Sequence, residues 1–251
     1  TAGLGMVMYN GDATGVLEVA RWSGVDRIAM MSWSGPTCTD AHYGNEIVWE
    51  AIQKFGNKII GVAVIDPTHM DSTEIQQEIQ LRHIEQGFIG MKPYVQMGLS
   101  YEDDLFSPWW EFGNEYHLYA LAHVFGAEHT GGIAGVSRLA DRFPNISWLI
   151  AHSGSSIAYA EEVAACIQQH PNVYAEITYT WVPNRCVEFL VENAGENNVV
   201  YGTDQPMRDP RPQMGWVAWS ELSLGIKEKI FATNFQSILD KNLLPKHNNP
   251  V

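Results

Sequence analysis

The stretch NVVYGTDQP, residues 198–206, carries an apolar run that ends on a carboxylate. Its valines and tyrosine are typical of a buried strand, and Gly202, Thr203 and Asp204 follow where the chain leaves the core. In folds built from parallel strands, ligands bind beyond the carboxyl ends of the strands. Asp204 is therefore a candidate functional residue, and the other strands are to be searched for side chains in the same place.

Similar apolar runs recur along the chain and alternate with longer amphipathic ones, at a spacing of roughly 25–30 residues that suits a βα unit. This alternation predicts parallel strands joined by helices. Strands are expected at residues 27–33, 58–66, 87–95, 118–126, 146–154, 172–178 and 198–204. Helices are expected at residues 14–23, 44–55, 72–86, 107–116, 132–143, 157–169, 184–194 and 226–240.

Two boundaries have local signals. The helix at 72–86 is expected to begin with Ser72 or Thr73 as its N-cap, because hydroxyl side chains accept hydrogen bonds from the first turn. Residues 205–221 contain three prolines and are expected to form a long loop after the last strand.

The expected fold is an α/β fold, a (β/α)8 TIM barrel, in one domain spanning residues 1–251. Seven strands are visible, so an eighth would precede residue 14, and the abrupt start at Thr1 favours a first segment that the sequence does not contain. A doubly wound open sheet is the alternative. No G-x-G-x-x-G follows the first strand, which weakens that alternative.

Composition excludes several classes of partner. The net charge is −14 with only 15 basic residues, which disfavours nucleic acids and anionic membrane surfaces. The three cysteines, Cys38, Cys166 and Cys186, form no C-x-x-C pair and fit a reducing, cytoplasmic compartment. No apolar run approaches the ~20 residues of a membrane span, and residues 1–11 lack the features of a signal peptide.

Polar side chains that could bind a metal or take part in catalysis follow four of the predicted strands. Imidazole and carboxylate together suit zinc, manganese or iron. Each residue alone has a structural explanation, but their common position favours a site. These side chains are Lys92 and Tyr94 on the third strand, His123 and then His129 at the fourth, His152 at the fifth, and Asp204 at the last.

Other sequence features carry less chemistry. The segment HSGSS, residues 152–156, is not the G-x-S-x-G turn of a serine hydrolase. The remaining histidines fall on helices, near helix ends or in the C-terminal tail, and are expected at the surface. They are His42, His69, His83, His117, His170 and His247.

Several segments, in order from about residue 16 to 240, resemble the amidohydrolase superfamily, in particular the branch that includes lactonases and metal-dependent decarboxylases. The segments that carry the resemblance are WSGVDRIAMMS, EQGFIGMKPY, WWEFGNEYHLYALAHVFG, RFPNISWLIAHSG, VVYGTDQP and IFATNFQSIL. The resemblance implies a barrel enzyme that binds a divalent metal, zinc first and manganese second, and acts on a small molecule.

The resemblance also implies roles for individual residues. His123 corresponds to the fifth-strand metal ligand of the family, with His129 as the competing choice. His152 corresponds to a sixth-strand ligand or proton-handling residue, and Asp204 to the general base that also touches the metal. Lys92 lies where some members carry a metal-bridging lysine.

One departure from the family is clear. Family members begin with a first strand that ends in His-x-His, and this sequence contains no H-x-H. Either a first segment is absent from the sequence, or the protein departs from the metal site. In the second case a metal-independent lactonase, or an inactive barrel used for binding, becomes the alternative.

The leading expectation is a metal-dependent hydrolase of a lactone, amide or ester, with Asp204 as general base and His152 stabilising the oxyanion. His129, Tyr94 and Arg208 are expected to contact the substrate. The alternative is a non-oxidative decarboxylase of an aromatic or unsaturated acid, with Arg208 or Arg211 holding the carboxylate. The tryptophan-containing segment 205–221, if exposed, would suit contacts in a homo-oligomer.

Overall fold

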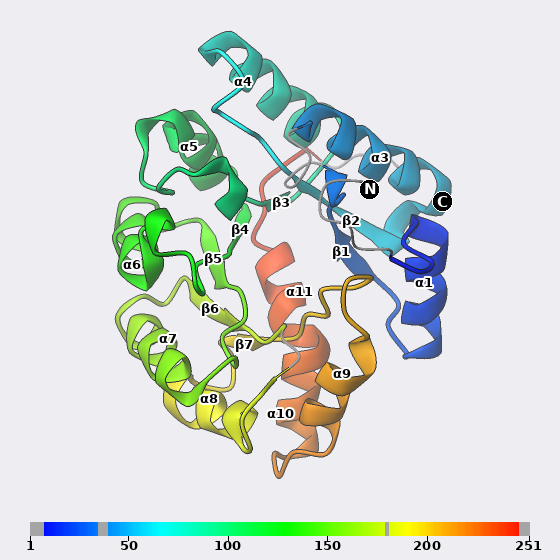
Figure 1. Ribbon diagram of the computed structural model, residues 1–251, viewed down its shortest axis with the longest axis vertical. Coiled ribbons are helices and arrows are strands. Elements are labelled where there is room, and N and C mark those ends of the chain that lie inside the picture. Colours follow the sequence, from blue (N-terminus) through cyan, green and yellow to red (C-terminus); the bar gives the residue numbers. More distant parts are fainter. Residues whose placement is uncertain (1–7, 35–39, 179–180, 246–251) are drawn as a thin grey trace.

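The computed structural model describes residues 8–34, 40–178 and 181–245, and in it seven parallel strands form one curled sheet with helices around it (Figure 1). Each strand pairs with the next one in the chain, in the order β1 to β7. The strands are β1 (Ile28–Met30), β2 (Ile59–Ala63), β3 (Gly90–Met91), β4 (Tyr119–Ala122), β5 (Ser147–Ile150), β6 (Val173–Glu176) and β7 (Val199–Val200). The predicted α/β barrel architecture is confirmed, and every predicted strand is present.

The helices follow the predicted alternation closely. They are α1 (Ala13–Trp22), α3 (Ala41–Phe55), α4 (Ser72–Ile79) continued by the π-helix η2 (Gln80–Glu85), α5 (Ser107–Glu115), α6 (Gly132–Arg142), α7 (Ile157–Gln169), α8 (Cys186–Ala194), α9 (Pro210–Ala218), and α10 (Leu224–Glu228), which η6 (Lys229–Thr233) joins to α11 (Asn234–Leu239).

Two local predictions were wrong. The segment 205–221 is not all loop, because α9 lies within it. Asp209 caps that helix by accepting from the Arg211 N–H, and Pro210 occupies the first turn, where a missing N–H costs nothing. The N-cap of α4 is Asp71 rather than Ser72 or Thr73. Its carboxylate accepts from Thr73 and Glu74 while Glu74 bonds back to the Asp71 N–H.

The two faces of the sheet alternate along every long strand. In β5, Trp148 and Ile150 face the surrounding helices, whereas Leu149 between them faces inward. Inward-facing side chains such as Leu149 and Val200 pack against Ile238 and Leu239 of α11, which lies near the centre of Figure 1. The interior of the curl is therefore a packed core, and period-two alternation determines which later residues face into it.

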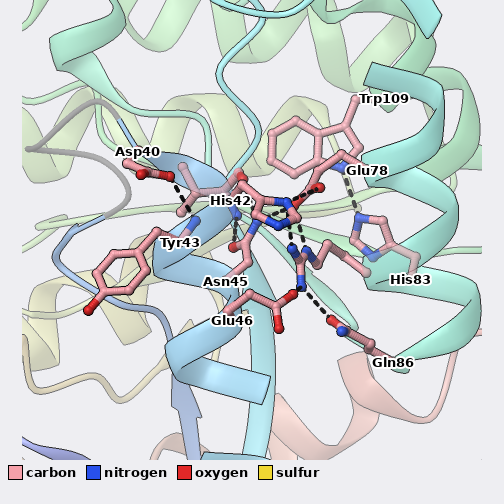
Figure 2. A network of polar contacts seen from close by, with 11 residues as sticks. Asp40, His42, Tyr43, Asn45, Glu46, Glu78, His83, Gln86 and Trp109 are labelled. Carbon is pink, nitrogen blue, oxygen red and sulfur yellow. Dashed lines mark hydrogen bonds and ion pairs between the residues drawn. The ribbon is translucent and has the colours of Figure 1, made fainter. Parts of the chain in front are cut away.

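A buried polar network joins α3 to α4 and η2 in the outer layer (Figure 2). Arg82 has no exposed surface and donates to Glu78 at 2.5 Å, to Gln86 at 2.8 Å and to Glu46. Asn45 donates to the carbonyl of Val64 and to Glu78, and accepts from the Val64 N–H. The network thus attaches α3, α4 and η2 to the carboxyl end of β2.

Two histidines expected at the surface are buried. His83 is fully buried, with Nδ1 2.6 Å from the carbonyl of Phe88 and Nε2 accepting from the Trp109 indole at 2.9 Å. His170 is 6% exposed and bonds to Ser137. Each imidazole has partners that compensate for its burial, which sequence position alone does not reveal. His247 lies outside the described residues.

Two further predictions concern the cysteines and the membrane. Cys166 and Cys186 are free and buried, and Cys38 lies outside the described residues. Within the described ranges, no helix has both the length and the apolar character needed to cross a membrane.

Candidate functional site

Three predicted site residues continue the inward-facing pattern just beyond the strand ends. Lys92 directly follows β3 and His123 directly follows β4, in phase with inward-facing Tyr119. On β7, Val200 faces inward, and Gly202 and Asp204 continue its alternate positions. The structure therefore brings side chains from several strands to the carboxyl end of the sheet, where barrel enzymes carry their chemistry.

His123 and His152 form a direct pair at this end. Nδ1 of His123 lies 3.2 Å from Nε2 of His152, and the ring centroids are 4.6 Å apart. The other ring nitrogen of His152, Nδ1, lies 2.5 Å from the carbonyl oxygen of Thr178. Because a carbonyl can only accept, Nδ1 carries a proton, and in neutral His152 the lone pair is on Nε2, facing His123.

Among the predicted site residues, His152 and Asp204 have an unusual backbone conformation. Their φ angles are 63° and 54°, in the left-handed region that residues with a β-carbon seldom adopt. Such conformations persist only where the surroundings hold them, and they gather at functional sites. The turn at His152 takes its side chain out of the strict alternation of β5, because inward-facing Leu149 is three residues earlier.

Burial and like charge oppose protonation of the two imidazoles. The pKa of His123 falls to about 3, because burial and then the charges of Lys92 and His152 disfavour its cation. Burial also lowers the pKa of His152, and the charges of Lys92 and Arg208 add to that effect, while the Thr178 carbonyl and Asp204 oppose it. Both rings are therefore neutral near pH 7.

Lys92 is a buried cation close to two carboxylates. Its residue is 2% exposed, and burial lowers its pKa to about 8, against the opposing charges of Asp204 and Glu176. Tyr94 lies beside it, with its ring centroid 5.5 Å from the lysine Nζ and 6.1 Å from that of His123. Burial and Asp204 raise the pKa of Tyr94 to about 12, so it remains a neutral hydroxyl.

Glu176 is a further candidate site residue, which was not predicted from the sequence. It ends β6, is 6% exposed, and lies in phase with inward-facing Tyr174. Burial raises its pKa to about 7, and the charge of Asp204 acts in the same direction. A carboxylate inside a predicted strand, two residues from an apolar neighbour on the same face, was the available signal.

The remaining predicted residues lie further out. His129, in the short 3₁₀ turn η5 (Glu128–Thr130), is exposed and bonds through Nε2 to the carbonyl of Val95, so the structure does not bring it to the His123–His152 pair. Arg208 lies 3.8 Å from Asp204 and is one-third exposed. Arg211 is 80% exposed and pairs with Asp209.

The donor set fits part of a metal site. Two nitrogens bound to one tetrahedral zinc at about 2.0–2.1 Å would be roughly 3.3 Å apart, which matches the His123–His152 pair. Over residues 8–34, 40–178 and 181–245, however, no three His, Cys, Asp or Glu side chains gather to hold a metal ion. The described residues offer two imidazole ligands and do not complete a coordination sphere.

A shallow cavity of about 460 Å³ opens beside the His152 turn. It is formed by the segments that follow β5, β6 and β7. Its lining residues are Ser155, Trp181, Val182, Pro183 and Trp216. The Ser155 hydroxyl is buried and, among the described residues, has no hydrogen-bond partner, while the Ser155 N–H bonds to the His152 carbonyl at 3.0 Å. This aromatic-walled cavity therefore adjoins the turn that carries His152.

A protein-family model described as amidohydrolase matches residues 17–235. The chain belongs to the amidohydrolase family. A search of curated proteins found no match. The family assignment agrees with the resemblance seen in the sequence motifs, and it covers all seven strands.

Several solved structures share the fold of this chain at low sequence identity. They include 2,6-dihydroxybenzoate decarboxylase complexed with 2,6-dihydroxybenzoate (TM-score 0.68, 13% identity, 89% of this chain and 86% of that chain). A second is 5-carboxyvanillate decarboxylase from Novosphingobium aromaticivorans, complexed with manganese (TM-score 0.71, 17% identity, 96% of this chain and 83% of that chain). A third is 4-oxalomesaconate hydratase from Rhodopseudomonas palustris (TM-score 0.70, 15% identity, 94% of this chain and 85% of that chain).

Proposed function

We propose that this amidohydrolase-family protein removes the carboxyl group from an aromatic or unsaturated carboxylic acid without oxidation. The observation that carries the proposal is the convergence of Lys92, Asp204 and Arg208 on the neutral His152 ring, at the carboxyl ends of the strands. An acidic substrate needs cations to hold it and a group that exchanges a proton with its carbon. The decarboxylases among the structural neighbours support this choice over hydrolysis.

Lys92 and Arg208 are the groups that would hold the substrate carboxylate. Lys92 is buried, so its charge acts in a medium of low polarity, where attraction for an anion is stronger than in water. Arg208 is one-third exposed and would meet the acid as it enters. Both imidazoles are neutral near pH 7, so they add no charge of their own beside these cations.

Asp204 is the group that would exchange the proton. In its protonated form it donates the proton to the carbon that bears the carboxylate. The π electrons of the ring or double bond form the new C–H bond. The bond between that carbon and the carboxyl group then breaks, CO₂ leaves, and the electrons of that bond restore the π system. Asp204 is left as a carboxylate and regains a proton from water, so the net reaction exchanges CO₂ for a proton.

A metal would be held by the two imidazoles. His123 Nδ1 and His152 Nε2 are the ligands that the described residues bring together, and zinc and manganese both accept imidazole. When bound, such an ion supplies positive charge to the carboxylate and phenolate oxygens of an acid. Zinc was the first expectation, and manganese accompanies the 5-carboxyvanillate decarboxylase neighbour.

Aromatic surfaces near the site support a flat substrate. Tyr94 packs edge-on against Trp33, with ring centroids 6.0 Å apart. Trp181 and Trp216 line the cavity of about 460 Å³ next to the turn that carries His152. Rings of this kind favour stacked or edge-to-face contact with a substrate ring.

The test is turnover of 2,6-dihydroxybenzoate and 5-carboxyvanillate in D₂O, followed by NMR. We expect loss of the acid and one deuterium at the carbon that carried the carboxyl group. Asp204→Asn is expected to abolish this exchange. Asp141→Asn is the matched control, because Asp141 is 75% exposed on α6. Folded wild-type protein that leaves a wider panel of aromatic and unsaturated acids unchanged would contradict the proposal.

Hydrolysis of a lactone, amide or ester is the second candidate, favoured by the family's description as amidohydrolase. In that reaction Asp204 would take a proton from water and His152 would stabilise the oxyanion. A panel of lactones and esters, followed in H₂¹⁸O by mass spectrometry, separates the two reactions. Incorporation of ¹⁸O into the product acid, lost in Asp204→Asn, would favour hydrolysis.

A further inference from the structure

Glu176 contacts both of the segments that hold His152. Its Oε2 accepts from the backbone N–H of His152 at 3.4 Å, and its Oε1 accepts from the N–H of Thr178 at 3.1 Å and from the Thr178 hydroxyl. The main chain adds a further bond, from the Ser153 N–H to the Glu176 carbonyl at 2.9 Å. One buried side chain therefore links the turn after β5 to the turn after β6.

Both segments matter to the conformation of His152. Its backbone has a φ of 63°, so the turn requires support from neighbours to persist. Its ring is held by the Thr178 carbonyl, 2.5 Å from Nδ1. Glu176 therefore bonds to the backbone N–H of His152 through Oε2, and through Oε1 to Thr178, whose carbonyl accepts from the His152 ring.

The neighbouring strand leaves room for this carboxylate. Gly202 follows β7 on the inward-facing side, and a β-carbon there would overlap Oε1 of Glu176 and the hydroxyl of Thr178. A side chain at position 202 would thus displace the very groups that support His152. The glycine two residues before Asp204 is explained by close approach rather than by an unusual φ angle.

We propose that Glu176 is a positioning residue, which fixes the orientation and the Nδ1–H tautomer of His152 through Thr178. With Nδ1 as the donor, the Nε2 lone pair is directed at His123 and the reacting space. Loss of Glu176 would release the Thr178 carbonyl and the His152 turn together. The effect on turnover rests on the proposed function, whereas the effect on the tautomer does not.

The experiment uses the full chain labelled with ¹⁵N-histidine and records the ring signals of the nine histidines. His152→Gln identifies the His152 signals. In the wild type we expect a protonated Nδ1 and an unprotonated Nε2. In Glu176→Ala and in Gly202→Ala we expect both tautomers, because each change removes or displaces the same carboxylate. His83 bonds to the carbonyl of Phe88 in the same way and is the internal reference that does not change.

Two further variants separate positioning from general destabilisation. Glu176→Gln keeps an acceptor oxygen but presents an NH₂ to one donor, so we expect partial rescue of the tautomer. Glu188→Gln is the matched control, a buried carboxylate on α8 that accepts from the Glu221 N–H, and it leaves His152 unchanged. On an accepted substrate, Glu176→Ala is expected to lower kcat by about 10- to 100-fold, as for residues that orient functional histidines.

The outcomes separate the two proposals. An unchanged His152 tautomer in folded Glu176→Ala and Gly202→Ala overturns the positioning role, whatever the activity. Changed tautomers in a protein that decarboxylates no acid support the positioning role and contradict the proposed function instead.

Discussion

His83 and His152 share the hydrogen bond made by Nδ1 and differ in the partner of Nε2. Each places Nδ1 against a backbone carbonyl, that of Phe88 for His83 and that of Thr178 for His152. The Nε2 of His83 then accepts from the Trp109 indole, which completes its bonding. The Nε2 of His152 instead faces His123, a ring that Lys92 and burial also keep neutral. The first arrangement fixes His83 within the helical layer, and the second places Nε2 of His152 against another imidazole.

The same contrast separates the charged groups around them. In the outer network, burial would raise the pKa of Glu78, but hydrogen bonds from Arg82, His42 and Asn45 lower it overall. At the strand ends, burial lowers the pKa of Lys92 to about 8 and raises that of Glu176 to about 7. One cluster favours its charged forms and the other opposes them. Groups that titrate near neutral pH in a buried site are the expected property of a catalytic centre.

The strongest test of the contrast removes one carboxylate from the site. Asp204→Asn is expected to lower decarboxylation by about 10²- to 10⁴-fold, the range for loss of a positioned proton-transfer group. Its unfolding free energy should change much less than its activity, because the Asp204 side chain is partly exposed and asparagine has nearly the same size and shape. The measurements are kcat and a denaturant titration. Full activity in this variant would assign the proton transfer to another residue.

The matching test removes the centre of the outer network. Arg82→Met leaves Glu78 buried without its cation, and we expect a loss of about 3–5 kcal/mol in unfolding free energy. Activity per folded molecule should be retained. Arg138→Met is the control, because the Arg138–Glu102 pair is largely exposed and worth about 0–1 kcal/mol. Equal losses from the two arginines would contradict the structural role of the network.

The two clusters also differ in how they respond to pH. His123 has a folded pKa of about 3 against an ordinary 6.5. As the pH falls from about 7 to about 5, the unfolded chain binds this proton and the folded chain does not, so stability falls by about 2 kcal/mol. Glu176 has a folded pKa of about 7 against 4.5, so the folded chain binds its proton first and stability rises by about 2 kcal/mol.

These opposed contributions offset one another in the wild type, and single variants separate them. Relative to the wild type, His123→Gln is expected to become more stable on going from about pH 7 to about pH 5, and Glu176→Gln less stable. Glu78 contributes little in this interval, because its pKa is lowered in the folded chain and an ordinary glutamate in the unfolded chain is still mostly charged at about pH 5. Urea titrations at the two pH values measure the slopes. If the unfolding free energies of the two variants, relative to the wild type, changed with pH in the same direction, the opposite pKa shifts of His123 and Glu176 would be contradicted.

Much of the fold was predictable because period-two and helical patterns are local. The seven apolar runs gave the strands, and their ends gave the positions of Lys92, His123 and Asp204 on one edge of the sheet. The paired segments are shorter than the runs. Residues 118–126 form one apolar run, but only Tyr119–Ala122 pair, since the chain then leaves the sheet to present His123.

What the sequence did not reveal depends on contacts between distant segments. Glu176 was read as part of an apolar strand, because its partners Thr178 and His152 meet it only after β5 and β6 pair. His83 was expected at the surface because it falls on a predicted helix away from the strand ends, yet Phe88 and Trp109 complete its bonding. The left-handed turn at His152 likewise has no local signal such as glycine.

The smallest expected effect concerns zinc, and it compares the same two histidines. The His123–His152 nitrogens are 3.2 Å apart and can share an ion, whereas both nitrogens of His83 already have partners. Added zinc should therefore shift the ¹⁵N ring signals of His123 and His152 and leave those of His83 in place. At a zinc concentration equal to Kd the gain in stability is only about 0.4 kcal/mol, so the ring signals are the sensitive measurement. His123→Gln should remove the response at His152, because one imidazole is a much weaker site than two. If zinc shifts His152 equally in that variant, the pair is not the ligand set, and the close approach of the two rings is a hydrogen bond alone.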